Sequence, residues 1–356
     1  MTAPPEHKSL IVVYHGNCLD GAASAWVVAR ACGVEQGSTD STSVTYVPYD
    51  HYDHAKAKKA IRRALTQEST LYFVDCAPEK SFLDELMTPA KSDNGKVKSI
   101  HVLDHHKTAY TTLQGYLAPA SSTVQLTIDI DPKRLSAAKM IWEKLLPQEI
   151  SPAILDLIDM MDGAAEGLKT PESFAAAALV DAQDISSIKR AFASLQGLAK
   201  LAFNEIVLRG KYIAADQDTR ISELLESTMV ATVKVLPNTD PIEVPIVNGA
   251  VQYFGRQVSF RLIELAKEHG AGVAFAWYMQ KTGAVTMGIR TNGNPDASVI
   301  AAHLCKTMGV TGGGHPTAAA VHFPSLLKFS QHIVLKDKSA EPHRKPIDKT
   351  RDLGPS

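Results

Sequence analysis

Carboxylate and imidazole side chains follow three short apolar runs in the first third of the chain, at residues 10–14, 71–74 and 100–103. Oxygen and imidazole donors of this kind suit Mn²⁺, Mg²⁺ or Fe²⁺ better than a thiolate site would. A carboxylate can also bridge two such ions, an arrangement that activates water and holds a phosphoryl group. The side chains are His15 and Asp20 after the first run, Asp75 after the second, and Asp104, His105 and His106 after the third.

These runs belong to a pattern in which β-branched segments alternate with helical periods, which predicts a parallel sheet with helices on both faces. Because ligands of such sheets bind at the carboxyl ends of the strands, we expect the six side chains at one edge. The predicted strands are Leu10–Tyr14, Val44–Val47, Leu71–Val74 and Ile100–Leu103. The predicted helices are Ala22–Ala31, His54–Leu65 and Leu135–Leu146.

Each of these side chains also has a structural interpretation. A single histidine such as His15 is most often hydrogen-bonded without being a ligand, and Asp20 and Asp75 could each cap a following helix. If the chain is extended at His105 and His106, the two rings point to opposite faces and one of them meets solvent. The coincidence of such residues at three strand ends nevertheless favours a shared site.

The length of 356 residues exceeds what one simple core holds, so we expect two domains. A second set of strands and helices begins near Val244, after an Ala-rich helical stretch. The end of the chain alternates charges with prolines and shows no core pattern, which predicts disorder. The expected organisation is a catalytic domain over residues 1–200, a helical linker over 201–240, a smaller α/β domain over 241–330 and a disordered tail over 331–356.

Composition narrows the classes of function. The 37 Lys and Arg residues balance 38 Asp and Glu residues, which argues against a large basic surface for long duplex nucleic acid. The four cysteines form no CxxC pair, so we expect no disulfide framework and a reducing, cytoplasmic location. We see no signal peptide and no run of about 18 apolar residues, so no membrane association is expected.

The motifs resemble those of the DHH phosphoesterase superfamily. The triplet is Asp104-His105-His106, the first motif resembles residues 14–25 (YHGNCLDGAASA), and the second is residues 74–78 (VDCAP). The run Gly312-Gly313-Gly314-His315-Pro316 is similar to the signature of the DHH-associated C-terminal domain. The resemblance implies an α/β parallel-sheet DHH domain, a helical connection and a smaller α/β domain, with the active site in the cleft between the two domains.

The resemblance also implies a centre of two metal ions, usually Mn²⁺, with Mg²⁺, Fe²⁺ or Co²⁺ as alternatives. His15 would hold one ion, Asp20 and His105 the other, and Asp75 would bridge the pair. A helix would add one more carboxylate, for which Asp159 and Asp162 are candidates. We favour Asp162 because it is next to Gly163, where the helix is expected to end. The catalytic set is Asp75, Asp104, His105 and His106, in which Asp104 orients an imidazole and His106 faces the substrate phosphate.

The first motif departs from the family at one position. The place of its first aspartate falls on Cys18, beside Asn17. Either a Cys18 thiolate serves as a metal ligand, which would soften the site towards Fe, Co or Zn, or Cys18 is a bystander. The identity and occupancy of the metal at this position stay open.

The second domain is expected to select the substrate. The glycine run lets backbone N–H groups approach a phosphate, and an arginine offers a planar, bidentate donor. The alternatives are a helix C-cap with a turn for the glycines, and a surface ion pair for the arginine. The predicted substrate-binding residues are His106, Arg290, Asn292, Gly312, Gly313, Gly314 and His315.

Together these observations predict a metal-dependent phosphodiesterase that hydrolyses small nucleotides, namely short oligoribonucleotides or linear or cyclic nucleotides. The resemblance is to the nanoRNase, oligoribonuclease and cyclic (di)nucleotide phosphodiesterase branch. The alternatives are a single-strand exonuclease of the same superfamily and a non-catalytic nucleotide-binding protein on a degenerate scaffold. The expected partner is a small nucleotide or short RNA, and a homodimer is compatible with the sequence.

Overall fold

The computed structural model describes residues 9–34, 43–49, 54–88, 96–162, 168, 170–249, 255–314 and 316–336. The fold is mixed α/β and comprises two compact units, residues 1–214 and 215–356. The division falls within one long helix, α9 (Phe203–Glu226). In the described part of the chain, no helix has the length and apolar character needed to cross a membrane.

The first unit is built on a five-stranded parallel sheet with the strand order β2-β1-β3-β4-β5. Its strands are β1 (Ser9–His15), β2 (Ser43–Tyr49), β3 (Ser69–Val74), β4 (Val97–Asp104) and β5 (Gln125–Ile130). Its helices are α1 (Leu19–Ala31), α2 (His54–Ala64), α3 (Lys80–Met87), α4 (Lys107–Leu113), α5 (Ala137–Leu145), α6 (Ala153–Asp162), α7 (Pro171–Asp181) and α8 (Ile188–Leu198). The predicted sheet is therefore confirmed, with one strand, β5, that we did not predict.

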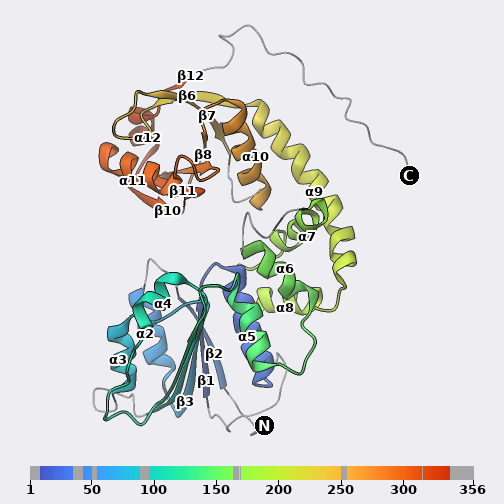
Figure 1. Cartoon of the computed structure of the whole chain (residues 1–356), viewed down its shortest axis with the longest axis vertical. Helices are drawn as coiled ribbons and strands as arrows, with labels where there is room; N and C mark the ends of the chain where they lie inside the picture. The colour runs from blue at the N-terminus through green and yellow to red at the C-terminus, as the bar shows by residue number, and fades with distance from the viewer. Residues whose placement is uncertain are drawn as a thin grey trace. The chain divides into compact units, whose positions relative to one another are not determined.

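Helices cover both faces of this sheet, as the continuous apolar strands require. The side chains of Leu10 and Val12 pack in one core cluster with α1 and α5, whereas Ile11 and Val13 pack in another with α2 and α3. Figure 1 shows α2 and α3 on one side of the sheet and α5 on the other. Successive side chains of β1 thus pack against helices on opposite faces of the sheet.

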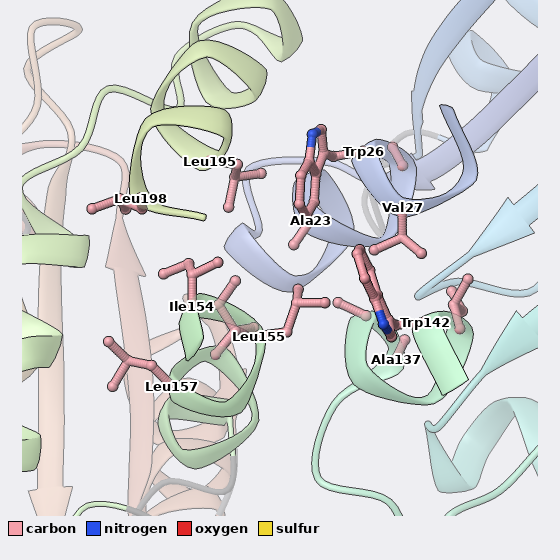
Figure 2. Packing of buried hydrophobic residues seen from close by; sticks show 14 of the residues in the cluster. Ala23, Trp26, Val27, Ala137, Trp142, Ile154, Leu155, Leu157, Leu195 and Leu198 are labelled. Atoms are coloured by element: carbon pink, nitrogen blue, oxygen red, sulfur yellow. The ribbon is translucent and has the colours of Figure 1, made fainter. Parts of the chain in front are cut away.

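The layer that includes α1 is anchored by aromatic packing. The rings of Trp26 on α1 and Trp142 on α5 are stacked, with centroids 6.0 Å apart. Leu195 on α8 and Leu155 on α6 belong to the same buried cluster (Figure 2). This packing fixes the position of α1 and α5 relative to the sheet, and the N-terminal ends of both helices contribute to the site described below.

The second unit contains a seven-stranded sheet with the order β10-β11-β9-β8-β7-β6-β12. All neighbouring pairs are antiparallel except β7 and β8. Its strands are β6 (Met229–Val233), β7 (Ile242–Asn248), β8 (Val273–Met279), β9 (Val285–Thr291), β10 (Thr311–Gly314), β11 (Ala318–Phe323) and β12 (Leu335–Lys336). Its helices are α10 (Gly255–Glu268), α11 (Ala297–Met308) and α12 (Leu326–His332).

Three details of this unit differ from the sequence-based expectation. Residues 229–233, predicted to lie in a helical linker, form strand β6, because their alternating side chains bury Ala231 and Val233 against the second sheet. Gly312–Gly314, predicted as a turn, form strand β10, while the left-handed C-cap of α11 is Gly309 (φ 63°). The disordered tail predicted over residues 331–356 begins too early, because α12 extends to His332 and Leu335–Lys336 form strand β12, which pairs with β6; residues 337–356 lie outside the described residues.

Candidate metal centre

Three adjacent strands deliver the candidate ligands to one edge of the parallel sheet. The register pairs Tyr14 of β1 with Val74 of β3, and Val74 with Leu103 of β4. The residues that follow, His15, Asp75 and Asp104, therefore lie side by side at the carboxyl ends of their strands, where ligands of such sheets bind.

Asp75 is at the centre of this arrangement and is 1% exposed. Its Oδ2 atom is 3.2 Å from His15 Nδ1, and its Oδ1 atom is 3.2 Å from His105 Nε2. The backbone of Asp75 is left-handed, with φ 55°, a conformation that Asp and Asn adopt more readily than most residues. Helix α3 begins at Lys80 with Glu79 as its N-cap, so Asp75 does not cap it. The two oxygens of one buried carboxylate thus face two different imidazoles.

His105 brings three carboxylates together. Its Nε2 atom is 3.2 Å from Asp75 Oδ1, and it is also close to Asp162 Oδ2 (3.5 Å) and Asp20 Oδ2 (3.7 Å). Its other nitrogen, Nδ1, is 3.3 Å from the carbonyl oxygen of Arg134. Because a carbonyl oxygen only accepts, Nδ1 carries a hydrogen and Nε2 is left for the carboxylates. A metal-binding histidine typically donates its other ring N–H to a carbonyl or carboxylate in this way, which fixes the orientation of the ring.

The electrostatics of His105 follow from these neighbours. Burial by itself lowers the pKa of this imidazole, but the close contact with Asp75 and the charges of Asp20, Asp75 and Asp162 raise it to about 9. Burial also raises the pKa of Asp75, and this effect is outweighed by the contacts with His105 and His15, which leave that pKa below its usual range. The carboxylates therefore stabilise the proton on His105 Nε2. A divalent cation bound between Nε2 and the carboxylates would replace that proton.

Asp20 is held by a helix that is distant in the sequence. Its Oδ2 accepts a hydrogen bond from Ala137 N (2.7 Å) and its Oδ1 from Ala138 N (2.8 Å), in the first turn of α5. The alternative in which Asp20 caps the helix that follows it is wrong, because Asp20 lies inside α1, whose N-cap is Cys18. Burial, together with the carboxylates of Asp75 and Asp162, raises the pKa of Asp20. Each oxygen can still offer a second lone pair towards His105.

The structure separates the two candidates on α6. Asp162, the last residue of the helix, reaches His105, whereas Asp159 Oδ1 accepts a hydrogen bond from Ser136 Oγ at 2.8 Å. Asp159 is not in any of the ligand groups among the described residues. The geometry therefore favours Asp162, and its role as a ligand stays a prediction.

Asp104 and His106 form a separate hydrogen-bonded pair at the same edge. Asp104 Oδ1 accepts from the backbone N–H groups of His105 (2.7 Å) and His106 (3.1 Å), and from His106 Nδ1 (2.7 Å). The Asp104 carboxylate is the first cause of a raised His106 pKa. Asp104 therefore has the contact needed to orient the His106 ring, as we predicted for that role.

Both histidines of the triplet face the site. Their ring centroids are 4.5 Å apart, and both rings approach Asp75, since His106 Nδ1 is 3.7 Å from Asp75 Oδ1. The alternative in which one ring points into solvent on the opposite face is wrong. Strand β4 ends at Asp104, so the alternation of an extended chain does not continue through the two histidines.

The side chains form three groups that could each hold a cation, of which the third is Asp75 with Asp104, His105 and His106. Within each group, one donor atom per residue lies within 4.8 Å of the others. We call the first group the sulfur subsite, made of His15, Cys18 and Asp75. We call the second group the oxygen subsite, made of Asp20, His105 and Asp162.

Unsatisfied polar atoms test whether these residues fit a metal. Asp75 Oδ1, His105 Nε2 and Asp104 Oδ2 are buried and make no hydrogen bond within the described part of the chain. Buried polar atoms are normally hydrogen-bonded, and exceptions in native proteins mark functional sites or bound ions. Asp75 belongs to the sulfur subsite and His105 to the oxygen subsite. The residues present therefore fit a divalent metal centre.

Three features that sequence reasoning missed shape this edge. Asn17 has a left-handed backbone (φ 55°), which turns the chain between β1 and Cys18 at the start of α1. Gly21 is essential for close packing, because a Cβ atom there would be 2.3 Å from the His15 carbonyl oxygen. The carbonyl of Arg134 is a third missed feature, and backbone contacts of this kind leave no signature in residue type.

A cavity of about 220 Å³ opens beside the sulfur subsite. It is lined by Asn17 and Cys18 from the β1–α1 turn, by Lys56 of α2, and by Ser187, the N-cap of α8. An entrance with an amide, a lysine and a helix N-terminus suits an anionic group. The cavity thus reaches the sulfur subsite from within the first unit, at Cys18.

The predicted substrate-binding residues of the second unit are only partly described. Arg290 Nε donates to Ser259 Oγ (2.9 Å), and its Nη1 donates to the carbonyl of Ile289 (2.9 Å). Burial lowers the pKa of Arg290, and no carboxylate within the described residues forms an ion pair with it, which removes the surface-pair alternative there. Asn292 is exposed and accepts from the backbone N–H of Asn294. His315 lies outside the described residues.

The glycine run has a structural explanation of its own. Gly312 pairs with Val321 of β11, and a Cβ atom at Gly312 would be 2.2 Å from the carbonyl oxygen of Ala320. Gly313 has no heavy atom within 4 Å of such a Cβ position. Close packing therefore accounts for Gly312, whereas Gly313 leaves an exposed stretch of edge backbone.

Comparison with known proteins identifies the second unit. The family model of the DHHA1 domain matches residues 245–334. The chain carries a DHHA1 domain. This is the DHH-associated C-terminal domain of the DHH superfamily, so the prediction of that domain from the glycine run is confirmed.

Other comparisons add little. A search of curated proteins found no match. One solved structure, described as an uncharacterized protein from Helicobacter pylori G27, has 15% identity with this chain and covers 88% of it and 92% of its own length. Its TM-score of 0.36 is too low to support any argument.

Proposed function

We propose that the protein is a DHH-superfamily phosphodiesterase that uses divalent metal ions to hydrolyse small nucleotide substrates. The observation that carries the proposal is Asp75, whose two buried oxygens face two separate groups of ligand atoms. The DHHA1 domain supports the superfamily, and the balanced charge of the chain favours small substrates over long duplexes.

The residues of the chain divide the work as follows. His15, Asp20, Asp75, His105 and Asp162 would hold two ions. When bound, such ions lower the pKa of water and neutralise charge on a phosphoryl group. His106, oriented by Asp104, would donate to a phosphoryl oxygen, and Arg290 with the edge backbone of β10 would bind the rest of the nucleotide. Asp20 and the first turn of α5 keep the oxygen subsite fixed, so that little reorganisation is needed when substrate binds.

The substrate class is part of the proposal. We infer short oligoribonucleotides, linear dinucleotides or cyclic nucleotides, and Mn²⁺ as the first ion to test. The cavity of about 220 Å³ beside Cys18 supports a compact group such as one phosphate with its sugar rather than a strand.

The experiment is hydrolysis of a panel with added Mn²⁺ by the wild-type chain and by Asp75→Asn. The panel contains a generic aryl phosphodiester, the dinucleotide pApA, a five-nucleotide RNA, cyclic AMP and cyclic di-AMP. Asn is the appropriate replacement because it tolerates the φ of 55° at this position. Turnover of at least one member by the wild type and of none by Asp75→Asn supports the proposal.

A matched control uses Asp156→Asn on the same helix as Asp162. Asp156 is exposed and pairs only with Lys139 among the described residues, so this variant should retain full activity. If the wild-type chain binds no metal and hydrolyses no member of the panel, the phosphodiesterase is refuted in favour of a binding protein on a degenerate scaffold.

A further inference from the structure

The two subsites differ in one chemical respect: only the first contains sulfur. Cys18 Sγ lies within 4.8 Å of a ring nitrogen of His15 and a carboxylate oxygen of Asp75. The second subsite offers two carboxylates and one imidazole. The two halves of a single centre therefore present different donor sets to a cation.

Cys18 lies at the start of α1, where its side chain joins His15 and Asp75. Cys18 is the N-cap residue of the 13-residue helix α1, and its side chain makes no capping hydrogen bond. Burial, followed by the charges of Asp75 and Asp20, raises the pKa of the Cys18 thiol well above its usual value, so the thiolate forms there only when a cation is bound beside it. Ser, Thr, Asp and Asn are the usual residues at an N-cap, so the presence of a cysteine has no explanation in helix stability.

The other cysteines do not share this position. Cys76 follows Asp75 directly, but it is fully buried and its Sγ points to the carbonyl oxygen of Val13 at 3.7 Å. Cys32 is at the opposite end of α1, where it forms the C-cap. Among the described cysteines, only Cys18 belongs to a group of candidate metal ligands.

We propose that the centre is asymmetric: the sulfur subsite binds a borderline-soft ion such as Zn²⁺, Co²⁺ or Fe²⁺ through the Cys18 thiolate, and the oxygen subsite binds a harder ion such as Mn²⁺ or Mg²⁺. Thiolate selects softer ions, whereas carboxylates suit harder ones. Asp75 would be shared, since one of its oxygens faces each side. This inference rests on the proposed function, because it concerns the same centre.

The test is spectroscopic and does not depend on activity. The full-length protein is stripped with a chelator and titrated anaerobically with Co²⁺, with a non-thiol reductant present. A cobalt–thiolate bond gives an intense near-ultraviolet charge-transfer band, and nitrogen and oxygen ligands do not. We expect this band in the wild-type protein and in Cys32→Ser, and its loss in Cys18→Ser. Circular dichroism of each variant checks the fold.

A second measurement uses Cys18→Asp, which replaces sulfur with oxygen at the same position. Loss of a residue that only hydrogen-bonds to a metal ligand typically lowers metal affinity by about 10–100-fold. Exchange of a direct ligand should therefore change the preference of the sulfur subsite for Zn²⁺ over Mn²⁺ by at least about tenfold. Competition titrations of the two ions in wild-type and variant protein measure that ratio.

The outcomes separate the two proposals. If Co²⁺ binds without the band, or if Cys18→Ser keeps it, the sulfur ligand is refuted and the metal-dependent phosphodiesterase stands. An unchanged ion preference in Cys18→Asp likewise refutes the asymmetry alone. If the wild-type protein binds no ion, both this inference and the proposed function fail.

Discussion

The substitution Asp75→Asn should abolish the stabilisation of the first unit by Mn²⁺. Asp75 offers one oxygen to each subsite, so a single change weakens both positions. The amide keeps the size of the side chain and tolerates its left-handed backbone, which limits other effects on folding.

The magnitude follows from linkage. An ion at 100 times its dissociation constant stabilises the folded state by about 2.7 kcal/mol, and two independent ions by roughly twice that. For a unit of this size, residues 1–214, each kcal/mol raises the melting temperature by about 2–4 °C. We therefore expect the first unit of the wild-type protein to melt about 5–11 °C higher with one ion bound, and roughly 10–20 °C higher with two.

Differential scanning calorimetry resolves this shift, with the chelator-treated protein as the baseline and Mn²⁺ added to each variant. Asp156→Asn serves as the control, because its carboxylate is exposed and outside both subsites. The control should show the full shift and Asp75→Asn almost none. A shift in Asp75→Asn equal to that of the wild type would refute the interpretation of Asp75 as the shared ligand.

Three further predictions concern pH, a second ligand and the glycine strand. Because the pKa of His105 is raised to about 9, its stabilising charge in the metal-free protein is present below about pH 6.5 and lost as pH rises through 9. Mn²⁺ affinity should therefore increase over that interval, and calorimetry in buffers of different ionisation enthalpy should detect the released proton. The Asp162→Asn variant should lose at least about tenfold in Mn²⁺ affinity, measured by titration, whereas Asp156→Asn should match the wild type. Finally, Gly312→Ala should destabilise the second unit by about 1–3 kcal/mol in urea unfolding, because its Cβ meets backbone 2.2 Å away, while Gly313→Ala should be neutral; equal effects would contradict the packing argument.

The sequence predicted the parallel sheet well because its strands are buried on both faces. Leu10 and Ile11 belong to different core clusters, so the run must be continuously apolar, and such runs are conspicuous. Strand β5 was missed because it is an edge strand with only partly buried side chains, in which Leu126 and Ile128 alternate with polar residues over a short span. Strand β10 was missed because glycine-rich segments usually form turns. Glycine is required at position 312 because the backbone of Ala320 lies too close for a Cβ atom, and the sequence does not reveal that contact.

The candidate ligands were also predictable, whereas their contacts were not. Residue type and position at strand ends brought His15, Asp75 and His105 to one edge, since the order of parallel strands fixes where their ends lie. The partners of Asp20 are backbone N–H groups 117 and 118 residues away in the sequence, and backbone groups carry no signal of residue type. The choice of Asp162 over Asp159 likewise required the hydrogen bond from Ser136, which depends on how α5 and α6 pack.

The way in which Asp20, Asp75 and Asp162 are held argues that the cluster exists for a cation rather than for stability. Three carboxylates within 3.7 Å of one imidazole nitrogen repel one another, and burial strengthens that repulsion. A fold selected for stability alone would replace such a cluster with apolar residues, a change that is often neutral or favourable. Here the chain instead compensates for the charge of Asp20 with two backbone N–H groups of α5, and it accepts a left-handed backbone at Asp75. Backbone strain of this kind concentrates at functional sites, and a divalent ion is the ligand that would turn the repulsion into binding energy.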